Sequence, residues 1–461
     1  MRKSLIDLAI GILSQAMLVG SGLIMLPFAV TRLPQAEIGI WYIYLTIQAM
    51  VFLLDFGITD TFIRFFSYVF AGAKELKDTT IPAKSDDDRV DPVLLSALLD
   101  TAHRIFLYMT LLAGIVMVTA GSYYIHVMTE GVALRESVWP SWAIFVVTML
   151  AQTYFQWQGA PLIGSGRARR NYEIAVRSRV AQVVFTILAL LIFPSLTMMS
   201  LGFAIAAIAM RLDYHLALAP VRSMTRGTIW SRADHRELTL TLLRSARQLG
   251  GTVVGVMLTN RLVALAIGWY AGLHVSAQYS IANQALVSLA SVAAVVQTML
   301  GPRIAKAGVA GDREVLKSMF SQSLVFGWAV CIAGGAILIT VVPPLLHLIG
   351  ANTSLPPTPL LLLMILLYSL EMNMFVSTRL ITTADNTIPY WKAMLITGGV
   401  IIVSVIMAGQ LGLGLTGILF AQLLAQLAYN YWRWPVYCFN YLGLRLRDVP
   451  HYALSRLGRA S

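Results

Sequence analysis

The chain has 461 residues, of which 57% are apolar and only 12% are charged, and its mean hydropathy is +0.72. Soluble globular proteins carry about 25% charged and about 45–50% apolar residues, so this composition excludes a cytoplasmic enzyme, a disordered regulator and a nucleic-acid-binding module. The sequence therefore predicts an all-α polytopic membrane protein. Its formal net charge of +12 is interpreted as a record of topology, because membrane proteins concentrate Lys and Arg on one side.

Apolar runs of about 20 residues are long enough to cross a bilayer as helices. Twelve such runs are predicted, with breaks often marked by Pro or Gly, as at Pro194. The first one follows Arg2 and Lys3, and since no small-residue cleavage motif comes after it, we expect a retained anchor. The predicted transmembrane helices are 8–31, 39–66, 98–125, 138–158, 174–193, 197–218, 247–268, 276–300, 318–342, 358–378, 390–408 and 413–432.

The basic residues predict the orientation of these helices. With the N-terminus inside, nearly all of the 34 Lys and Arg fall on cytoplasmic segments or the helix ends beside them, and only Arg32 and Arg135 fall on outside loops. This distribution agrees with the positive-inside rule. Both the N-terminus and the C-terminus are therefore predicted to be cytoplasmic. The longest outside loop, 343–357, carries no charge and offers no constellation for a periplasmic active site.

The sequence divides into two halves of six predicted helices each. The boundaries are an N-terminal lobe 1–218, a basic connector 219–246, a C-terminal lobe 247–440 and a basic tail 441–461. The run AEIGIWYI at 36–43 leads into the second helix much as HVSAQYSI at 274–281 leads into the eighth. Repeated halves are how transporters build a central cavity that opens to either side. Chance similarity between apolar segments is the alternative.

The same segments resemble a known family. The runs RLPQAEIGIW at 32–41, LDFGI at 54–58, AQYS at 277–280, GPRI at 301–304 and GDRE at 311–314 are similar to segments of bacterial polysaccharide exporters. The resemblance covers nearly the whole chain. It points to the O-antigen and lipid-linked oligosaccharide flippases of the multidrug/oligosaccharidyl-lipid/polysaccharide (MOP) export superfamily. Pro34 departs from the family pattern, which usually has Gly after the Arg-Leu pair.

The resemblance implies a flippase of the bacterial inner membrane, with two pseudo-symmetric six-helix lobes around a central cavity. Such a protein would move an undecaprenyl-pyrophosphate-linked oligosaccharide, an O-antigen (lipopolysaccharide) or exopolysaccharide repeat unit, from the cytoplasmic to the periplasmic leaflet by alternating access. We expect no cofactor, with coupling to Na⁺ or H⁺. The expected partners are that lipid-linked substrate, membrane lipid and other polysaccharide-assembly proteins.

Two charged residues lie deep in predicted helices, where a charge costs at least about 2.5–3.5 kcal/mol. Arg261 directly follows Asn260 in the seventh helix, and Asn373 comes two residues after Glu371 in the tenth. Two interpretations of Arg261 stay open: a forked contact to a substrate pyrophosphate, or a fixed ion pair with Glu371. Glu371 and Asn373 are candidates for a coupling-ion site, and a hydrogen-bonded structural acid is the alternative for Glu371.

Other candidates lie nearer the ends of helices. Asp60 and Arg64 are four residues apart on one helix face, which favours a salt bridge, and capture of the pyrophosphate by Arg64 is the alternative. Arg32 is expected to guide the head group outward or to anchor its helix at the interface. Asp55 is a second coupling-ion candidate, or else a group that caps or pairs within the first half.

Aromatic residues recur at equivalent positions of the two halves, at Trp41 and Tyr279. The same group includes Tyr42, Tyr44, Trp269 and Tyr270. A belt of these aromatic side chains at the outer membrane interface is the default interpretation. Sugar stacking by Trp41 and Tyr279 in a cavity is the alternative.

The one enzyme-like pattern is the D-D-x-x-D of Asp87, Asp88 and Asp91. Membrane glycosyl- and prenyl-transferases use such acids to hold Mg²⁺ against a diphosphate. Because the run lies in a polar stretch without a second acid cluster, a solvated loop is favoured over a metal site, and we expect no enzyme. The remaining alternative is a cation-coupled multidrug exporter of the same fold, which favours an acidic cavity and fits Arg261 poorly.

Overall fold

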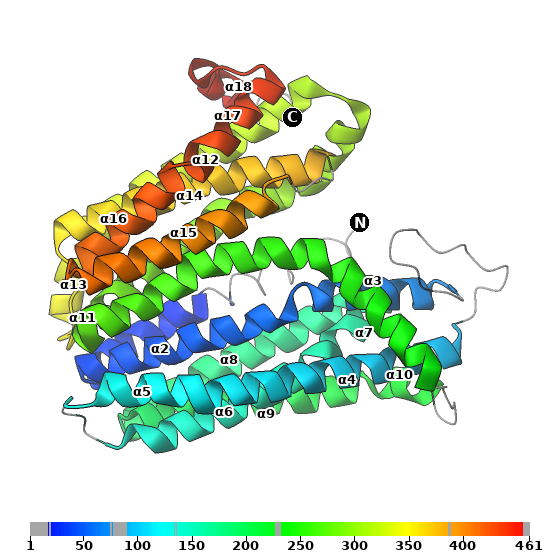
Figure 1. Cartoon of the computed structure of the whole chain (residues 1–461), viewed down its shortest axis with the longest axis horizontal. Coiled ribbons are helices and arrows are strands. Elements are labelled where there is room, and N and C mark those ends of the chain that lie inside the picture. The colour runs from blue at the N-terminus through cyan, green and yellow to red at the C-terminus, as the bar shows by residue number, and fades with distance from the viewer. Residues whose placement is uncertain are drawn as a thin grey trace. The chain divides into compact units, whose positions relative to one another are not determined.

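The computed structural model describes residues 17, 20–73, 76, 90–132, 134, 136–225, 232–385 and 389–454, and the regular structure of these residues is helical, without a strand (Figure 1). The chain forms two compact units. Unit 1 comprises Met1–Leu33 and Ile43–Val254, and unit 2 comprises Pro34–Tyr42 and Gly255–Ser461. Two of the three boundaries between the units therefore fall inside helices, one in α2 and one in α11.

Unit 1 begins with a helix over residues 20–32 and continues through short and long helices. They are α2 (Gln35–Val51, shared with unit 2), η1 (Phe52–Asp55), α3 (Ile58–Phe70), α4 (Pro92–Val116), η2 (Met117–Gly121), α5 (Ser122–Thr129), α6 (Val138–Phe155), η3 (Gln156–Gln158), α7 (Gly159–Gly164), α8 (Ala168–Ile192), α9 (Leu196–Ala217), α10 (Ala219–Met224) and the first part of α11 (Arg232–Ala310).

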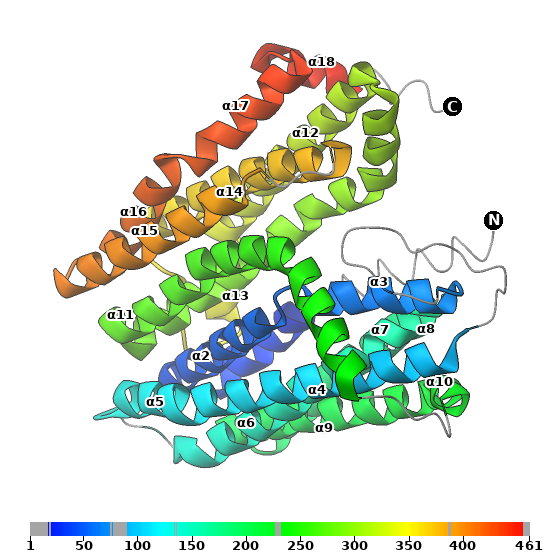
Figure 2. The same cartoon turned by 45° about the vertical axis from the view of Figure 1, so that its right-hand side comes forward.

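In unit 1 the long helices α4, α6, α8 and α9 run beside one another in both views, with α6 and α8 packed along α9 (Figures 1 and 2). Close backbone approach holds helices together in lipid, where leaving water supplies no driving force. Gly202 provides it here, because a Cβ at this position would lie 2.7 Å from the Cα of Thr186 on α8. At the basic end, Asp213 of α9 forms salt bridges with Arg170 (3.3 Å) and Arg177 (3.2 Å) of α8.

Unit 2 contains the rest of α11 and the C-terminal helices. They are α12 (Arg313–Thr340), α13 (Val342–Leu348), α14 (Thr358–Asp385), α15 (Trp391–Gln410), α16 (Gly414–Leu427), α17 (Asn430–Leu442), η4 (Leu446–Asp448) and α18 (Val449–Leu454). α14 packs against α12 and α17, and α15 packs against α16. α18 lies in the predicted basic tail and packs on α12, where the Ser318 hydroxyl donates a hydrogen bond to the Tyr452 carbonyl at 3.2 Å.

Nine helices among the described residues are long and apolar enough to cross a membrane. The prediction of an all-α polytopic chain is thus confirmed for the described residues. The number twelve and the sidedness stay predictions, partly because residues 8–16, 18 and 19 of the first predicted helix lie outside the described residues. Two predicted helices, 247–268 and 276–300, lie within α11 on either side of a kink at Gly272.

The predicted continuous helix 39–66 is wrong. The chain unwinds after α2 into the 3₁₀ turn η1, and Phe56 (φ 42°) and Gly57 (φ 76°) then take left-handed backbone conformations before α3 begins. The apolar run continues through this break, so hydropathy alone did not show it. The predicted helix 413–432 is likewise wrong, because α16 ends at Leu427 and α17 starts at Asn430.

A single glycine interrupts α11. Gly272 has φ 83° and ψ 171°, and the backbone is helical on both sides of it. An L-residue is strained in this region of φ and ψ, whereas glycine is not. The predicted loop between the seventh and eighth helices is therefore a sharp turn at Gly272, with a helix on either side of it.

Candidate functional site

Polar side chains of α11 and α14 come together within unit 2. The Asn260 amide donates a hydrogen bond to the Glu371 carboxylate, with Nδ2 and Oε1 2.9 Å apart. Arg261 interacts electrostatically with that carboxylate, and Tyr279 interacts with both charges. We call Asn260, Arg261, Tyr279 and Glu371 the Glu371 cluster. The structure thus unites four of the residues that the sequence singled out.

Helical spacing decides which neighbours join the cluster. Tyr368 precedes Glu371 by three residues, so both lie on one face of α14, and its hydroxyl donates to Asn283 Oδ1 on α11 at 2.6 Å. Asn373 follows Glu371 by two residues and points elsewhere: its Oδ1 accepts a hydrogen bond from Trp328 Nε1 of α12 at 2.7 Å. Asn373 therefore braces α12 against α14, and the structure does not bring it to the Glu371 carboxylate.

Arg261 does not form the contact ion pair with Glu371 that was one of its two interpretations. Among the described residues, no carboxylate oxygen lies within 4.0 Å of the Arg261 guanidinium, and the Arg261 side chain makes no hydrogen bond. Both side chains are half-buried. The arrangement leaves guanidinium N–H groups available to an oxyanion, next to a carboxylate that Asn260 already holds in place.

The aromatic belt does not fit three of the six residues that motivated it, whereas Trp269 is 40% exposed. Trp41 and Tyr279 are each 5% exposed, and Tyr44 is fully buried with its hydroxyl 3.0 Å from Ser141 Oγ. A belt residue would present its ring to lipid and headgroups. These side chains are instead enclosed by protein, and the sugar-stacking interpretation of Trp41 and Tyr279 stays a prediction.

The two segments that echo each other in sequence meet within unit 2. The Gln35 amide donates to the His274 carbonyl at 3.1 Å. A Cβ on Gly39 would collide with the carbonyl oxygen of Leu273. The start of α2 thus lies directly against the turn of α11 that follows Gly272.

Asp55 belongs to a separate polar network in unit 1. Its Oδ1 accepts hydrogen bonds from the backbone N–H and the hydroxyl of Thr59, both at 2.9 Å. The Thr59 hydroxyl in turn accepts from Gln156 Nε2 at 3.3 Å. The carboxylate therefore caps α3 across the left-handed turn, and the network joins the two places in unit 1 where a helix gives way to a 3₁₀ turn.

The salt bridge expected between Asp60 and Arg64 is absent. Both residues belong to the part of the chain that the structure describes, their side chains are exposed, and no ion pair joins them. The Arg64 guanidinium instead lies 5.6 Å from the centre of the Phe65 ring. Arg32 is the last residue of the helix over 20–32 and is exposed. Neither arginine belongs to the Glu371 cluster of unit 2, so their proposed contacts to substrate stay predictions.

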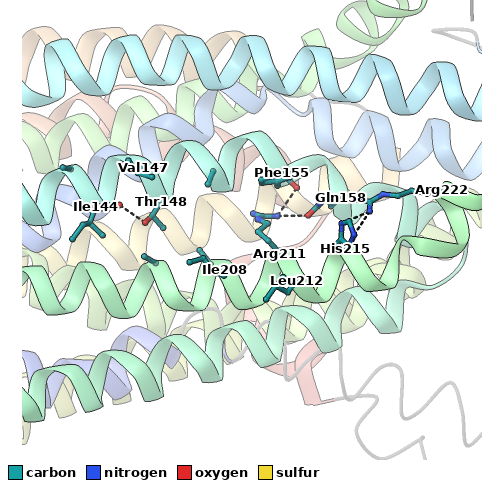
Figure 3. Close-up of a pocket in the computed structure, with 14 residues that line it drawn as sticks. Ile144, Val147, Thr148, Phe155, Gln158, Ile208, Arg211, Leu212, His215 and Arg222 are labelled. Atoms are coloured by element: carbon teal, nitrogen blue, oxygen red, sulfur yellow. Dashed lines mark hydrogen bonds between the residues drawn. The ribbon is translucent and has the colours of Figure 1, made fainter.

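Arg211 on α9 is a residue that the sequence analysis counted only as a sign of topology. Its guanidinium donates to the carbonyls of Phe155 (3.0 Å) and Gln152 (3.2 Å) and to Gln158 Oε1 (3.4 Å) (Figure 3). These acceptors lie where α6 ends and η3 begins, so their carbonyls lack normal helical partners. No sequence signal marks this role, because the 3₁₀ turn itself is not visible in the sequence.

The transferase pattern gains no support from the described residues. Asp91 caps α4 by accepting hydrogen bonds from the backbone N–H groups of Val93 (2.8 Å) and Leu94 (3.3 Å), while Asp87 and Asp88 lie outside the described residues. Within the described ranges, no group of three His, Cys, Asp or Glu is arranged to hold a metal ion.

No protein-family model matches the sequence, and no curated protein matches it. Solved structures do share its fold. An inward-facing multidrug resistance MATE family transporter of the MOP superfamily has a TM-score of 0.63 and 13% identity, over 94% of this chain and 94% of that one. The lipid II flippase MurJ, in an inward closed conformation, has a TM-score of 0.63 and 12% identity, over 98% of this chain and 91% of that one.

A MOP superfamily transporter from Pyrococcus furiosus, whose structure is described as having a binding pocket of reverse polarity, has a TM-score of 0.55 and 12% identity, over 96% of both chains. At these identities the likeness shows the fold alone. The chain therefore has the fold of MOP superfamily transporters, and together with its apolar helices this indicates a multi-pass membrane protein.

Proposed function

We propose that the protein is a transporter, not an enzyme, and that it flips an undecaprenyl-pyrophosphate-linked oligosaccharide from the cytoplasmic to the periplasmic leaflet of the bacterial inner membrane. The observation that carries the proposal is the Glu371 cluster. It places a guanidinium with available N–H groups inside an apolar helical unit, in a fold that a lipid II flippase shares. A cationic group at this depth has a physical reason to exist if it receives an anion.

Arg261 is the group that would bind the pyrophosphate. A guanidinium stays charged at any working pH, and its planar fork matches two phosphate oxygens at once. Tyr279 and Tyr368 lie close enough to Arg261 to interact with it electrostatically. In this proposal the lobes alternate between inward and outward access while the lipid tail stays in the bilayer.

Glu371 supplies the coupling in the same proposal. Without substrate, the positive charge of Arg261 disfavours a second cation at the carboxylate. When a pyrophosphate neutralises that guanidinium, the affinity of Glu371 for Na⁺ or H⁺ rises, because the nearby positive charge is compensated. The two sites are thus energetically linked, so that occupancy of one changes the affinity of the other.

A second candidate function is supported by the carboxylate itself. Glu371 is a half-buried acid among aromatic side chains, an environment that suits an organic cation, and a MATE multidrug transporter shares the fold. In that case Arg261 would oppose the cargo, and its removal would leave export intact or improve it.

The test uses a strain whose surface polysaccharide depends on this chain. We would compare Arg261→Ala, Arg261→Lys and the control Arg303→Ala, which alters an exposed arginine of the same helix α11. Surface polysaccharide, lipid-linked oligosaccharide retained in the cytoplasmic leaflet and protein abundance are measured together. We expect Arg261→Ala to abolish export and to accumulate the lipid-linked intermediate, Arg261→Lys to keep part of it, and Arg303→Ala to behave as the parent.

Normal polysaccharide export after Arg261→Ala at normal abundance would contradict the pyrophosphate contact. A rise in drug susceptibility with Glu371→Gln and unchanged polysaccharide would favour the multidrug exporter instead. If the flippase proposal is right, Glu371→Gln removes the dependence of export on the Na⁺ or H⁺ gradient while Asn260 can still bond to the amide oxygen.

A further inference from the structure

A groove of about 650 Å³ runs between α6 and α9 of unit 1, whereas the Glu371 cluster belongs to unit 2. Figure 3 shows its two ends: Ile144, Val147 and Ile208 lie at one, and His215 and Arg222 lie at the other, with Arg211 between them. None of the 14 lining residues is acidic.

The apolar end presents hydrocarbon to the surroundings of the protein. Val147 is 67%, Ile208 60% and Leu212 62% exposed, which is expected of side chains that face lipid. The hydroxyl of Thr148 is bonded to the Ile144 carbonyl at 2.7 Å, so it adds no free polar group. From Ala204 to His215 the groove follows α9 for about 16 Å at 1.5 Å per residue. That is close to one leaflet of a hydrocarbon core about 30 Å thick.

The basic end has no carboxylate to balance it. Arg211 and His215 are four residues apart on one face of α9, and Arg222 of α10 donates to the His215 ring, with Nη1 and Nδ1 2.7 Å apart. Asp213 lies on the opposite face of α9, where Arg170 and Arg177 of α8 engage it. It therefore does not neutralise the groove.

The lack of a compensating negative charge is clearest at Arg211. The groups to which it donates are two backbone carbonyls and an amide oxygen, all of them uncharged. Its Nε–H is buried and has no hydrogen-bond partner among the described residues. The other neighbours of this half-buried guanidinium are the rings of Phe155 and Tyr214, which carry no carboxylate. At the edge of a membrane such an uncompensated charge attracts an anion.

We propose that this groove binds an anionic phospholipid of the leaflet predicted to face the cytoplasm. One acyl chain lies between α6 and α9, and the phosphate lies at Arg211, His215 and Arg222. The length favours a phospholipid, because the groove is one leaflet deep whereas a polyprenyl chain is much longer than a leaflet. The inference does not depend on what the protein transports, since it concerns a different unit from the proposed substrate site.

The test measures lipid binding by the purified full-length protein with native mass spectrometry, after exchange into nanodiscs of phosphatidylcholine that contain phosphatidylglycerol. Arg222→Gln removes a charge at the basic end without touching the carbonyls that Arg211 holds. Ala204→Phe fills the groove. The matched controls are Arg167→Gln, an exposed arginine outside the groove, and Val184→Phe, an enlargement at an exposed position of α8.

We expect the parent to retain phosphatidylglycerol in preference to phosphatidylcholine. Arg222→Gln should weaken this retention roughly fivefold, the effect of one basic group near an anionic lipid. Ala204→Phe should abolish the retained lipid, and both controls should match the parent.

Three results would overturn the proposal. Equal retention of phosphatidylcholine and phosphatidylglycerol would show that the groove does not select lipids by the charge of their head group. An equal loss with Arg167→Gln would assign the preference to the overall basic surface. Displacement of the lipid by inorganic phosphate alone, or by undecaprenyl phosphate at equal concentration, would assign the groove to a free anion or to the polyprenyl carrier.

Discussion

Individual polar side chains in unit 1 form hydrogen bonds with backbone groups that are left without helical partners where helices break. Asp55 is an instructive case, because its carboxylate satisfies two donors of Thr59 at the start of α3. A charged group in an apolar segment is costly, and these two bonds explain its presence without any ion. The structural role and the coupling role that the sequence suggested can therefore be separated by substitution.

Asp55→Ala should destabilise the purified protein by about 1 kcal/mol, the usual cost of removing a helix cap. The thermal unfolding midpoint in detergent measures this. Asp60→Ala, a change of an exposed acid within α3, is the control and should leave the midpoint unchanged.

Asp55→Asn distinguishes the two roles of the same residue. Asparagine caps about as well as aspartate, so both the midpoint and export should match the parent if Asp55 is only a cap. Lost export with a normal midpoint would show that its charge is needed and would support the coupling-ion role.

Arg211→Lys should also lower the unfolding midpoint, because a lysine has no planar fork to reach the carbonyls of Gln152 and Phe155 together. Each buried carbonyl left without a partner costs about 1–3 kcal/mol. The Arg222 side chain hydrogen-bonds only to the His215 ring among the described residues. Arg222→Gln should therefore be close to neutral in the same measurement.

At the residue scale the sequence predicted the deep charges but not their partners. Arg261 and Glu371 were visible because charges are rare in apolar helices. Asn260, which actually bonds to Glu371, was ranked with the substrate contacts, and the importance of Arg211 was missed. Both errors have one cause: which donor reaches which acceptor depends on the rotation of packed helices and on 3₁₀ turns, and neither leaves a pattern in hydropathy.

At the scale of elements, the kink of α11 is the most specific feature. Gly272 lets the second half of the helix change direction, and the turn after it lies against Gly39 and Gln35 at the start of α2. A helix that straightened at this point would lose that contact.

Gly272→Ala should destabilise the protein by about 1–3 kcal/mol, the cost of holding an L-residue in this backbone region. The control is Gly301→Ala in the same helix, where the backbone is helical and a Cβ meets nothing within 4 Å. That change should be neutral or slightly stabilising. A drop in the unfolding midpoint for Gly301→Ala equal to that for Gly272→Ala would contradict the explanation from φ and ψ.

Helix positions were largely predictable, whereas helix breaks were not. Predicted helix 138–158, for example, begins where α6 begins, because the hydrophobic run and its polar flank coincide there. The break at Phe56 and Gly57 lies inside a run that stays apolar, and one glycine there reads as an ordinary helical residue. Breaks that tertiary hydrogen bonds stabilise carry no local signal.

At the scale of the whole molecule, the orientation in the membrane is the prediction with the widest consequences. The basic ends of α8, α9 and α10 should face the cytoplasm, because Lys and Arg stay on that side during insertion. The assignment of the phospholipid groove to one leaflet follows from it.

Cysteine labelling tests this orientation in a chain whose Cys331 and Cys438 are replaced by Ala. Ser137→Cys should react with a membrane-impermeant maleimide in intact cells, and Ser223→Cys should react only after the membrane is permeabilised. Both serines are exposed. The reverse pattern would invert the predicted topology, and labelling of both sites in intact cells would contradict the assignment of the two loops to opposite faces.

Composition was enough to predict the class of the molecule, and the loose family motifs led to the superfamily whose fold the structure has. Neither the composition nor the motifs identified the substrate. MATE transporters and a lipid II flippase share the fold at similar TM-scores, so the fold alone does not distinguish their cargo. In the function proposed above, that distinction depends on a few charges such as Arg261.

The kink at Gly272 also bears on how the gene tolerates change. Every missense change of a glycine codon introduces an L-residue, and no L-residue is at ease at φ 83° and ψ 171°. Codon 272 should therefore be depleted of all missense alleles in a library selected for export, the small residues alanine and serine included, while codon 301 keeps them. If codon 272 tolerates no substitution, whatever the size or chemistry of the new side chain, the requirement is for the backbone conformation of glycine.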